Sequence, residues 1–218
     1  MTIRPTKRRL LSRISTGIIA FGCIALAIGH AAAACLPEKG AQCQGVKLGN
    51  VNWQEAKLQG GNFRQADLQY ANLSGADLTG ADLRGANLQF AQLEHSTLTD
   101  ANLEGADLRW SNLDYATGAQ SRLVGARLYK ARLHQADFSR ADFTKADLSH
   151  TNLTDANLHR AELQEANLDG ARLDAALLRQ ANLFGASMRH VHLIGALFCE
   201  ATWTDGRVCH APSVGGCK

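Results

Sequence analysis

Residues 66–115 read ADLQY ANLSG ADLTG ADLRG ANLQF AQLEH STLTD ANLEG ADLRW SNLDY, which is one five-residue unit written again and again. Leucine stands at the third position of each unit, and a small residue, usually alanine, stands two positions before it. The spacing continues without insertion or deletion from Val46 to Trp203, with another large apolar residue replacing leucine at some units. Self-similarity at a fixed short period indicates a repeat architecture.

A period of five matches neither the 3.6-residue period of a helix nor the two-residue period of a strand. The pattern predicts a coil of short extended pieces with a corner between each pair. Leucine and alanine point inward, and the other three residues of each unit face water. Four units then close a square coil of about 20 residues, and successive coils bond backbone to backbone roughly 4.8 Å apart. The fold class we expect is therefore an all-β solenoid.

The unit resembles the pentapeptide-repeat family, whose consensus is A-(D/N)-L-x-x. The resemblance covers residues 46–205 and implies a right-handed quadrilateral β-helix of about eight coils, or roughly 38 Å at the strand spacing. One central position departs from the pattern, because Gly118 takes the place of a leucine. We expect a local cavity or bulge accommodated by neighbours there; a kink or a ligand notch is the alternative.

Residues 1–34 have the order of an export signal. Lys7, Arg8 and Arg9 precede an apolar run from Ile14 to Ile28, and Ala31–Ala34 supply a small-residue cleavage site. The run is short for a membrane span, so we expect a cleaved signal peptide and no transmembrane span in the mature chain. A twin-arginine signal and lipidation of Cys35 are the alternatives. The expected location is periplasmic or secreted.

The charge of the mature chain argues against nucleic-acid binding. The whole chain has 23 basic and 20 acidic residues. Five of the basic residues and none of the acidic ones lie in residues 1–34, which leaves 18 against 20 and a net charge of −2. A protein that binds nucleic acid through a basic surface is not expected to have this balance.

The five cysteines of the mature chain lie only at its two ends. Disulfides persist in oxidising compartments, and close ligand spacing such as C-x-x-C, typical of metal sites, is absent. Since bridged Cα atoms lie within about 7 Å, the two ends cannot be joined, and Cys35–Cys43 is the expected bridge of a cap at residues 35–45. For the tail at residues 206–218, resemblance to the ending of other exported pentapeptide proteins implies Cys199–Cys217, with Cys209–Cys217 as second choice.

Residues 20 apart should stack in columns on the surface, and one column stands out. It contains Tyr70, Phe90 and Trp110 and continues with Lys130, and Tyr129 lies beside it in the sequence. Exposed aromatic rings supply contact area for a protein or sugar partner. The alternative is that the rings only stack on one another and protect the edge of the sheet. These five residues are our candidate binding surface.

Other surface features predict less. Arg140 above Arg160 forms a small positive spot that we interpret as a solvated face, and the column Gly85, Gly105, Gly125 is explained by turn geometry. His190, His192 and His210 lack an acidic or cysteine partner, so we predict no metal. Asp and Asn before each leucine should bond to the turn backbone.

No catalytic or phosphate-binding motif is present, and a filled convex rod offers no cleft for an acid and a base. We therefore predict no enzyme activity and no cofactor. The expected function is an exported structural or binding scaffold with a protein or cell-envelope partner. The resemblance supplies one alternative, because some family members mimic DNA and bind DNA gyrase, which protects it from quinolones. Those members are cytoplasmic and strongly acidic, whereas this chain has an expected signal and a mature net charge of −2.

Overall fold

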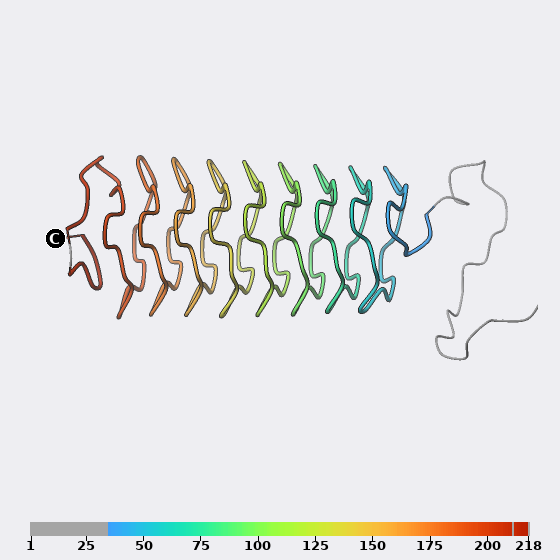
Figure 1. The fold of residues 1–218 in the computed structure, drawn as a ribbon, viewed down its shortest axis with the longest axis horizontal. Helices are drawn as coiled ribbons and strands as arrows, with labels where there is room; N and C mark the ends of the chain where they lie inside the picture. Colours follow the sequence, from blue (N-terminus) through green and yellow to red (C-terminus); the bar gives the residue numbers. More distant parts are fainter. Residues whose placement is uncertain (1–34, 211, 218) are drawn as a thin grey trace, which may run out of the picture.

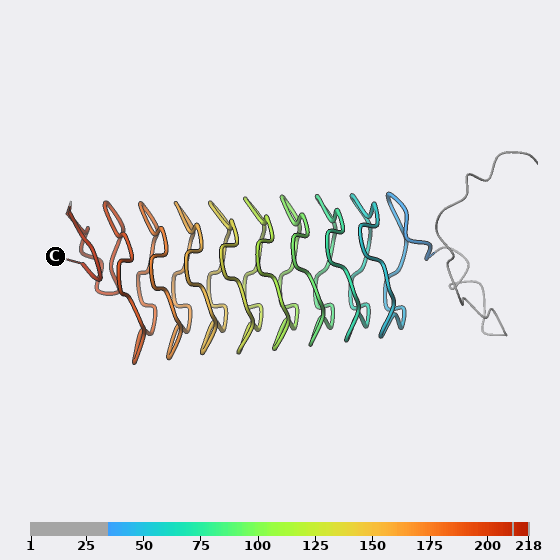
Figure 2. The same ribbon diagram turned by 90° about the horizontal axis from the view of Figure 1, so that it is seen from below.

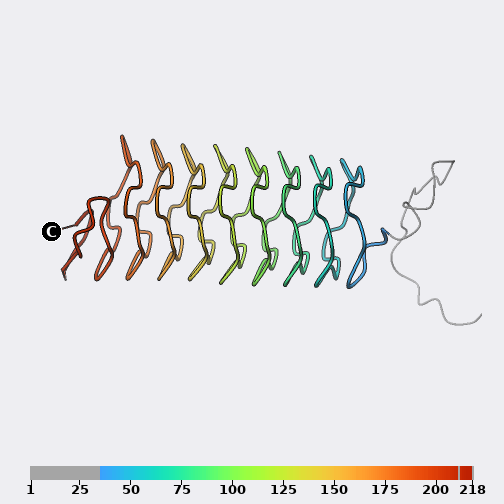
Figure 3. The same cartoon turned by 90° about the horizontal axis from the view of Figure 1, so that it is seen from above.

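The computed structural model describes residues 35–210 and 212–217. These residues wind into a stack of similar coils along one straight axis. The side view and the views from below and above show the first coil at one end of the rod and the last coil at the other (Figure 1, Figure 2 and Figure 3). The expected signal peptide at residues 1–34 lies outside the described residues.

Parallel bridges join residues 20 positions apart on every face of the coil. One column of eight such bridges runs from Gln42 through Asn62 and Asp82 to Thr202. Each bridge is made by a single residue per face, so the described residues contain isolated bridges and turns with no helix and no extended strand. The predicted coil of 20 residues is confirmed, and its sheet faces are only one bridge wide.

Four of the five backbone amides of a repeat are used by the winding itself. In the unit that begins at Ala71, Asn72 N donates to Val51 O of the previous coil and Leu73 N donates to Gln92 O of the next. Gly75 N also reaches the next coil, and Ala71 N closes the turn on Leu68 O at 3.0 Å. The fifth amide, that of Ser74, is capped by the side chain of Asn72 at 3.1 Å. The Asp or Asn of the repeat is thus a turn cap, as predicted, because it satisfies the one donor that the winding leaves free.

Each corner contains a residue with positive φ. The glycines of the predicted column, Gly85, Gly105 and Gly125, have φ of 63–65°. The same conformation occurs in many non-glycine residues, for example Tyr70 at 59° and Lys130 at 57°. A turn with positive φ at its third residue suits glycine, and other L-residues are strained there by roughly 1–2 kcal/mol.

The interior is a continuous column of leucine and alanine. Leu68, Leu88 and Leu108, which stand 20 residues apart, are each 1% exposed or less. Phenylalanine takes the leucine place at Phe63, Phe138, Phe143 and Phe198, and all four are fully buried. Neighbour-on-neighbour burial of this kind is what stabilises a solenoid.

The ring of Phe138 fills the space that Gly118 leaves. A Cβ atom added to Gly118 would lie 2.2 Å from Cε1 of Phe138, which belongs to the next coil of the same column. Gly118 keeps the backbone hydrogen bonds of a normal repeat, donating to Asp137 O at 2.7 Å. A neighbour accommodates the missing leucine, as expected, and the neighbour is a larger side chain one coil away.

The amino-terminal end is closed by the predicted disulfide between Cys35 and Cys43, whose Cα atoms are 4.8 Å apart. Cys43 occupies a leucine position of the repeat and is fully buried. The winding is already regular there, since the first bridge joins Gln42 to Asn62. The bridge therefore closes the end of the core itself.

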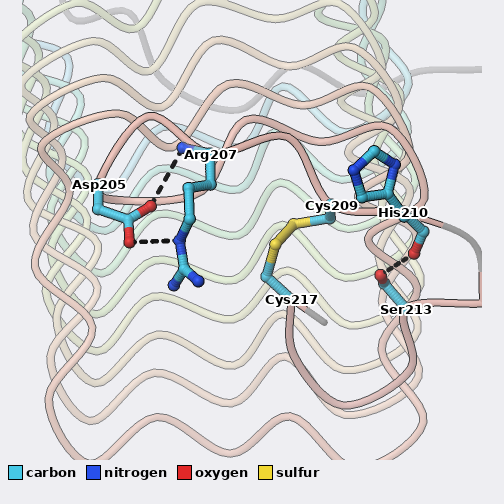
Figure 4. The surroundings of a disulfide bond; sticks show 6 residues. All are labelled: Asp205, Arg207, Cys209, His210, Ser213 and Cys217. Carbon is cyan, nitrogen blue, oxygen red and sulfur yellow. Dashed lines mark hydrogen bonds and ion pairs between the residues drawn. A yellow bond between two sulfur atoms is a disulfide. The ribbon is translucent and has the colours of Figure 1, made fainter.

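The carboxyl-terminal disulfide corrects the prediction. Cys209 pairs with Cys217, with Cα atoms 4.9 Å apart, and Cys199 is free and half-buried; Figure 4 shows the bridge and its surroundings. The Cys199–Cys217 pairing was wrong because the tail turns back on the last coil, where antiparallel bridges join Thr202 to Val208 and Leu197 to Val214. This reversal carries Cys209 to the core end, where it is fully buried.

Candidate binding edge

The rings of Tyr70, Phe90 and Trp110 form one straight stack on a corner of the rod. The centroids of Tyr70 and Phe90 are 4.9 Å apart with 8° between their planes, and those of Phe90 and Trp110 are 5.0 Å apart with 2°. Their spacing follows the coil repeat because each ring comes from the same corner of successive coils. The column predicted from the sequence is therefore present.

Tyr129 and Lys130 extend this stack by one coil. The Tyr129 ring meets Trp110 edge-on at 5.8 Å and meets His150 edge-on at 5.6 Å. The Lys130 ammonium lies 5.2 Å from the centre of the Tyr129 ring, within the range of a cation–π contact. We call Tyr70, Phe90, Trp110, Tyr129 and Lys130 the aromatic edge.

The stacked rings remain open to solvent. Tyr70 is 51% exposed, Phe90 37% and Trp110 39%. All three have positive φ, which is an unfavourable backbone conformation for a bulky residue. Stacking contributes about 0.5–1.5 kcal/mol per ring pair, which offsets part of that strain. Mutual stacking, the alternative expected from the sequence, is thus observed, and it still leaves a third to a half of each side chain uncovered.

The stacking decides which part of each ring a partner meets. Phe90 lies between two parallel rings, so its faces are covered and its edge points outward. Trp110 is covered by Phe90 and also contacts the guanidinium of Arg109 at 5.4 Å from its ring centre. A sugar that stacks on an aromatic ring needs a free ring face. The geometry therefore favours a partner that packs apolar groups against ring edges.

Paired charges flank the edge on one side. Arg109 Nε donates to Asp107 Oδ1 at 2.8 Å, and Arg127 lies 3.5 Å from Asp107 Oδ2. Burial raises the pKa of Asp107, but the hydrogen bonds from Arg109 and the two cations outweigh it, so the pKa lies below its usual value. Around Phe90 itself the flanking side chains are the uncharged amides Asn87, Gln89 and Gln92. The middle of the edge is therefore apolar and uncharged, and the charges lie toward its ends.

A second, shorter aromatic stack occupies the next corner. His95 and Tyr115 are parallel at 4.9 Å, and Tyr115 meets His134 edge-on at 5.8 Å. Tyr115 is 44% exposed. The sequence predictions did not include this second stack, although the 20-residue spacing from His95 to Tyr115 was a signal for it.

Between the two stacks lies a buried carboxylate that sequence reasoning missed. Asp114 is 3% exposed, accepts a hydrogen bond from His134 N at 2.9 Å and pairs with the guanidinium of Arg132. Arg132 stands where the repeat normally has the Asp or Asn that caps the amide of His134. The carboxylate of the previous coil thus replaces a missing turn cap. Two other turns are capped in the same way by a carboxylate of the previous coil. Asp169 accepts a hydrogen bond from Arg189 N, and Asp174 accepts one from Ile194 N.

The remaining candidates do not converge on a site. Arg160 Nε donates to Gln180 Oε1 at 2.6 Å, and Gln180 in turn bonds Glu200, so this column is a chain of surface hydrogen bonds. Within residues 35–210 and 212–217, no three His, Cys, Asp or Glu side chains gather closely enough to hold a metal ion. That part of the chain contains no helix that is long and apolar enough to cross a membrane.

Comparison with protein families gives a match to the model for pentapeptide repeats in eight copies. The matched segments are residues 39–75, 62–100, 101–140, 121–160, 141–180 and 161–198. They include every residue of the aromatic edge and Gly118, which takes a leucine place in the interior. Among curated proteins, none matches the chain.

Several solved structures are similar to this chain. HetL, a pentapeptide repeat protein involved in heterocyst differentiation regulation from the cyanobacterium Nostoc sp. strain PCC 7120, is 29% identical, with 78% of this chain and 92% of HetL covered and a TM-score of 0.47. Full-length QnrB1, a plasmid-mediated fluoroquinolone resistance protein, is 20% identical over 75% of this chain and 84% of its own, with a TM-score of 0.46. A pentapeptide repeat protein from the Arabidopsis thaliana thylakoid lumen is 30% identical over 56% of this chain and 71% of its own, with a TM-score of 0.25.

Proposed function

We propose, on the premise that this chain belongs to the pentapeptide repeat family, that it is an exported rigid rod that binds a protein or cell-envelope partner through its aromatic edge. The proposal includes the right-handed winding of the four-sided coil that is general in this family. It assigns no catalytic step to the protein.

The exposure of strained aromatic residues supports the binding role. Other corners place glycine at the same turn position, for example Gly85 and Gly105, with nearly the same φ. Tyr70, Phe90 and Trp110 instead place large apolar groups on the surface at positions where their backbone is strained. Tryptophan and tyrosine are enriched among the residues that dominate protein binding energies. A role in contact with a partner explains why such residues occupy these corners.

The two disulfides support export. Cys35–Cys43 and Cys209–Cys217 close opposite ends of the core, and disulfides of this kind persist in oxidising compartments such as the periplasm. A cleaved signal at residues 1–34 agrees with this location. We therefore place the protein in the periplasm or outside the cell.

We do not adopt the alternative of a DNA mimic that binds gyrase. DNA mimicry requires a continuous negative surface, whereas arginines pair with acidic residues along this rod. The pairs include Arg109 with Asp107, Arg132 with Asp114 and Arg189 with Asp169. Supercoiling by gyrase in the presence of the mature protein tests this choice, and inhibition or protection of gyrase would reverse it.

The experiment for the binding edge uses glycine substitutions, because glycine suits the corner conformation. The triple variant Tyr70→Gly, Phe90→Gly, Trp110→Gly removes the rings and relieves the backbone strain. Pull-down from envelope extract should lose the partner in the triple variant and keep it in Tyr115→Gly, which removes an exposed ring from the neighbouring corner. Equal recovery of the partner with both variants and the native chain would remove the aromatic edge from the proposal.

A further inference from the structure

We propose that the partner of the aromatic edge is a second copy of this chain, lying alongside the first in the antiparallel direction. This inference rests on the proposed function, since it names the occupant of the same edge. It is carried by the repeat distance of the rings and by the distribution of charge along the edge.

The repeat distance restricts the occupant. The ring edges point outward in a straight series with steps of 4.9 and 5.0 Å. A partner that meets every ring in the same way needs groups that repeat with the same step. Stacked β-coils have this step, because it is the distance between hydrogen-bonded strands. A second rod of this chain supplies this step along its whole length, so its ring edges lie against those of the first.

The charges favour one relative direction. Beyond Trp110, toward the carboxyl-terminal end, the edge is flanked by Arg127 and Lys130. Arg127 shares the single carboxylate of Asp107 with Arg109, which leaves a net positive charge there, whereas Arg132 is paired with Asp114. Beyond Tyr70, toward the amino-terminal end, stands Asp67, which pairs with none of the described cations within 4 Å. Two parallel copies would place Lys130 beside Lys130, and like charges at an interface are unfavourable. Two antiparallel copies place the cationic end of one beside Asp67 of the other.

The antiparallel arrangement also fixes the level of the two-fold axis. Asp67 and Arg127 lie in one column of bridges, three coils apart, through Asn87 and Asp107. Pairing Asp67 with Arg127 in both directions puts the axis midway between them, at a level between Phe90 and Trp110. The centre of the contact then holds the rings of Phe90 and Trp110, with the paired charges Asp107 and Arg109 beside them. The Asp67–Arg127 pairs of opposite charge lie at its two ends. Rings at the centre with charged groups around them agree with the apolar core and polar rim of a protein interface.

The contact is narrow, so the complex should be weak. It is one corner wide and about as long as the four coils that carry the aromatic edge, which is small beside a standard interface of about 800 Å² per partner. We therefore expect a dissociation constant of roughly micromolar or weaker.

Sedimentation equilibrium of the exported chain tests the proposal, with Cys199→Ser as the background so that no dimer forms through the free thiol. The background chain should associate as concentration rises through the micromolar range. Phe90→Arg should abolish association, and Tyr115→Arg should preserve it. The two sites are matched, with φ of 58° and 61° and exposures of 37% and 44%. A background chain that stays monomeric at all concentrations overturns the proposal, and so does equal loss in both variants.

A charge exchange tests the direction. Asp67→Arg alone and Arg127→Asp alone should each weaken association by tenfold or more, and the double variant should restore most of it. Thermal melts of each variant establish that the monomer remains folded. Failure of the double variant to recover association overturns the assigned pairing.

A spin label at His190→Cys in the same background reports the orientation directly. His190 lies in the same corner column, far from the two-fold axis, so antiparallel labels are more than nine coils apart, or roughly 45 Å at 4.8 Å per coil. A distance less than half of this would show parallel rods and overturn the proposal. If the chain proves monomeric but the pull-down still depends on the rings, the binding edge stands and only its assignment to a second copy fails.

Discussion

The interior and the corners of this rod respond to opposite constraints. An interior position depends on the coil next to it: Gly118 is tolerated because the Phe138 ring occupies its space. The corner at Gly105 is free of neighbours in this sense, since a Cβ atom added there would meet no atom within 4 Å. Its restriction comes from the backbone, because φ there is 65°. Packing therefore controls which residues fit inside the coil, and local backbone strain controls which fit at its corners.

The strongest test of this contrast is Gly118→Leu, which restores the repeat consensus. The new side chain would collide with the Phe138 ring, and we expect the free energy of unfolding to fall by about 3 kcal/mol, the upper range for overpacking. Urea unfolding followed by circular dichroism measures the change.

The matched variant is the double substitution Gly118→Leu, Phe138→Leu, which makes both positions regular. It should recover most of the lost stability, to within about 1 kcal/mol of the native chain, because the Phe138 ring no longer occupies the space that a leucine at position 118 needs. Losses that simply add would show that the two positions do not share one space.

At the Gly105 corner, the loss of stability on substitution should depend only on how well the new residue tolerates positive φ. Gly105→Val places a β-branched residue at φ 65°, and we expect a loss of about 1–2 kcal/mol. Gly105→Asn is the control, since asparagine tolerates this conformation, and it should lose less than half as much. Equal losses measured by urea unfolding would mean that something other than backbone strain restricts this corner.

Two buried serines of the interior differ in whether their hydroxyl is hydrogen-bonded. Among the described residues, Ser96 Oγ is the buried side-chain polar atom without a hydrogen bond, whereas Ser111 Oγ donates to Leu108 O at 2.6 Å. Both serines stand in the alanine place of the repeat. Ser96→Ala should stabilise the protein by about 1 kcal/mol, and Ser111→Ala should destabilise it by a similar amount. The difference between their melting temperatures is the measurement, and the same sign for both would contradict it.

The smallest expected effect is a change in thermal stability at acidic pH. Hydrogen bonds from Ser187 and Arg189 lower the pKa of Asp169 from 3.8 to about 2. A lowered folded-state pKa contributes stability above pH 3.8 that is lost as the pH falls from about 4 to about 2. Asp169→Asn should therefore flatten the dependence of melting temperature on pH in that window and leave the pH 5–7 values nearly parallel to those of the native chain. An unchanged acid slope would show that Asp169 makes no such contribution.

The sequence was sufficient for features that depend on the period. The burial of every fifth side chain, the 20-residue coil and the stack of Tyr70, Phe90 and Trp110 all follow from counting residues. The tail was not predictable in this way, because its antiparallel return to the last coil has no period, and the Cys209–Cys217 pairing depends on that return. The filling of the Gly118 space depends on contact between coils, although the large ring 20 residues later was a visible signal.

The replacement of turn caps shows the same limit. Asp at the position before leucine was correctly read as a bond to its own turn. Asp114, which follows a leucine, caps a turn in the next coil because Arg132 interrupts the pattern there. That role depends on a break in the repeat one coil away, and a reading of each unit by itself does not reveal it.

The bridges between residues 20 apart also constrain how the length of this rod changes in evolution. A duplication of five residues would preserve the buried leucines, yet every later side chain would move to the neighbouring corner. A duplication of 20 residues would lengthen the rod and return each later side chain to its original side. Tandem growth that keeps the surface aligned therefore proceeds by whole turns, and gene segments of 60 nucleotides are its natural unit.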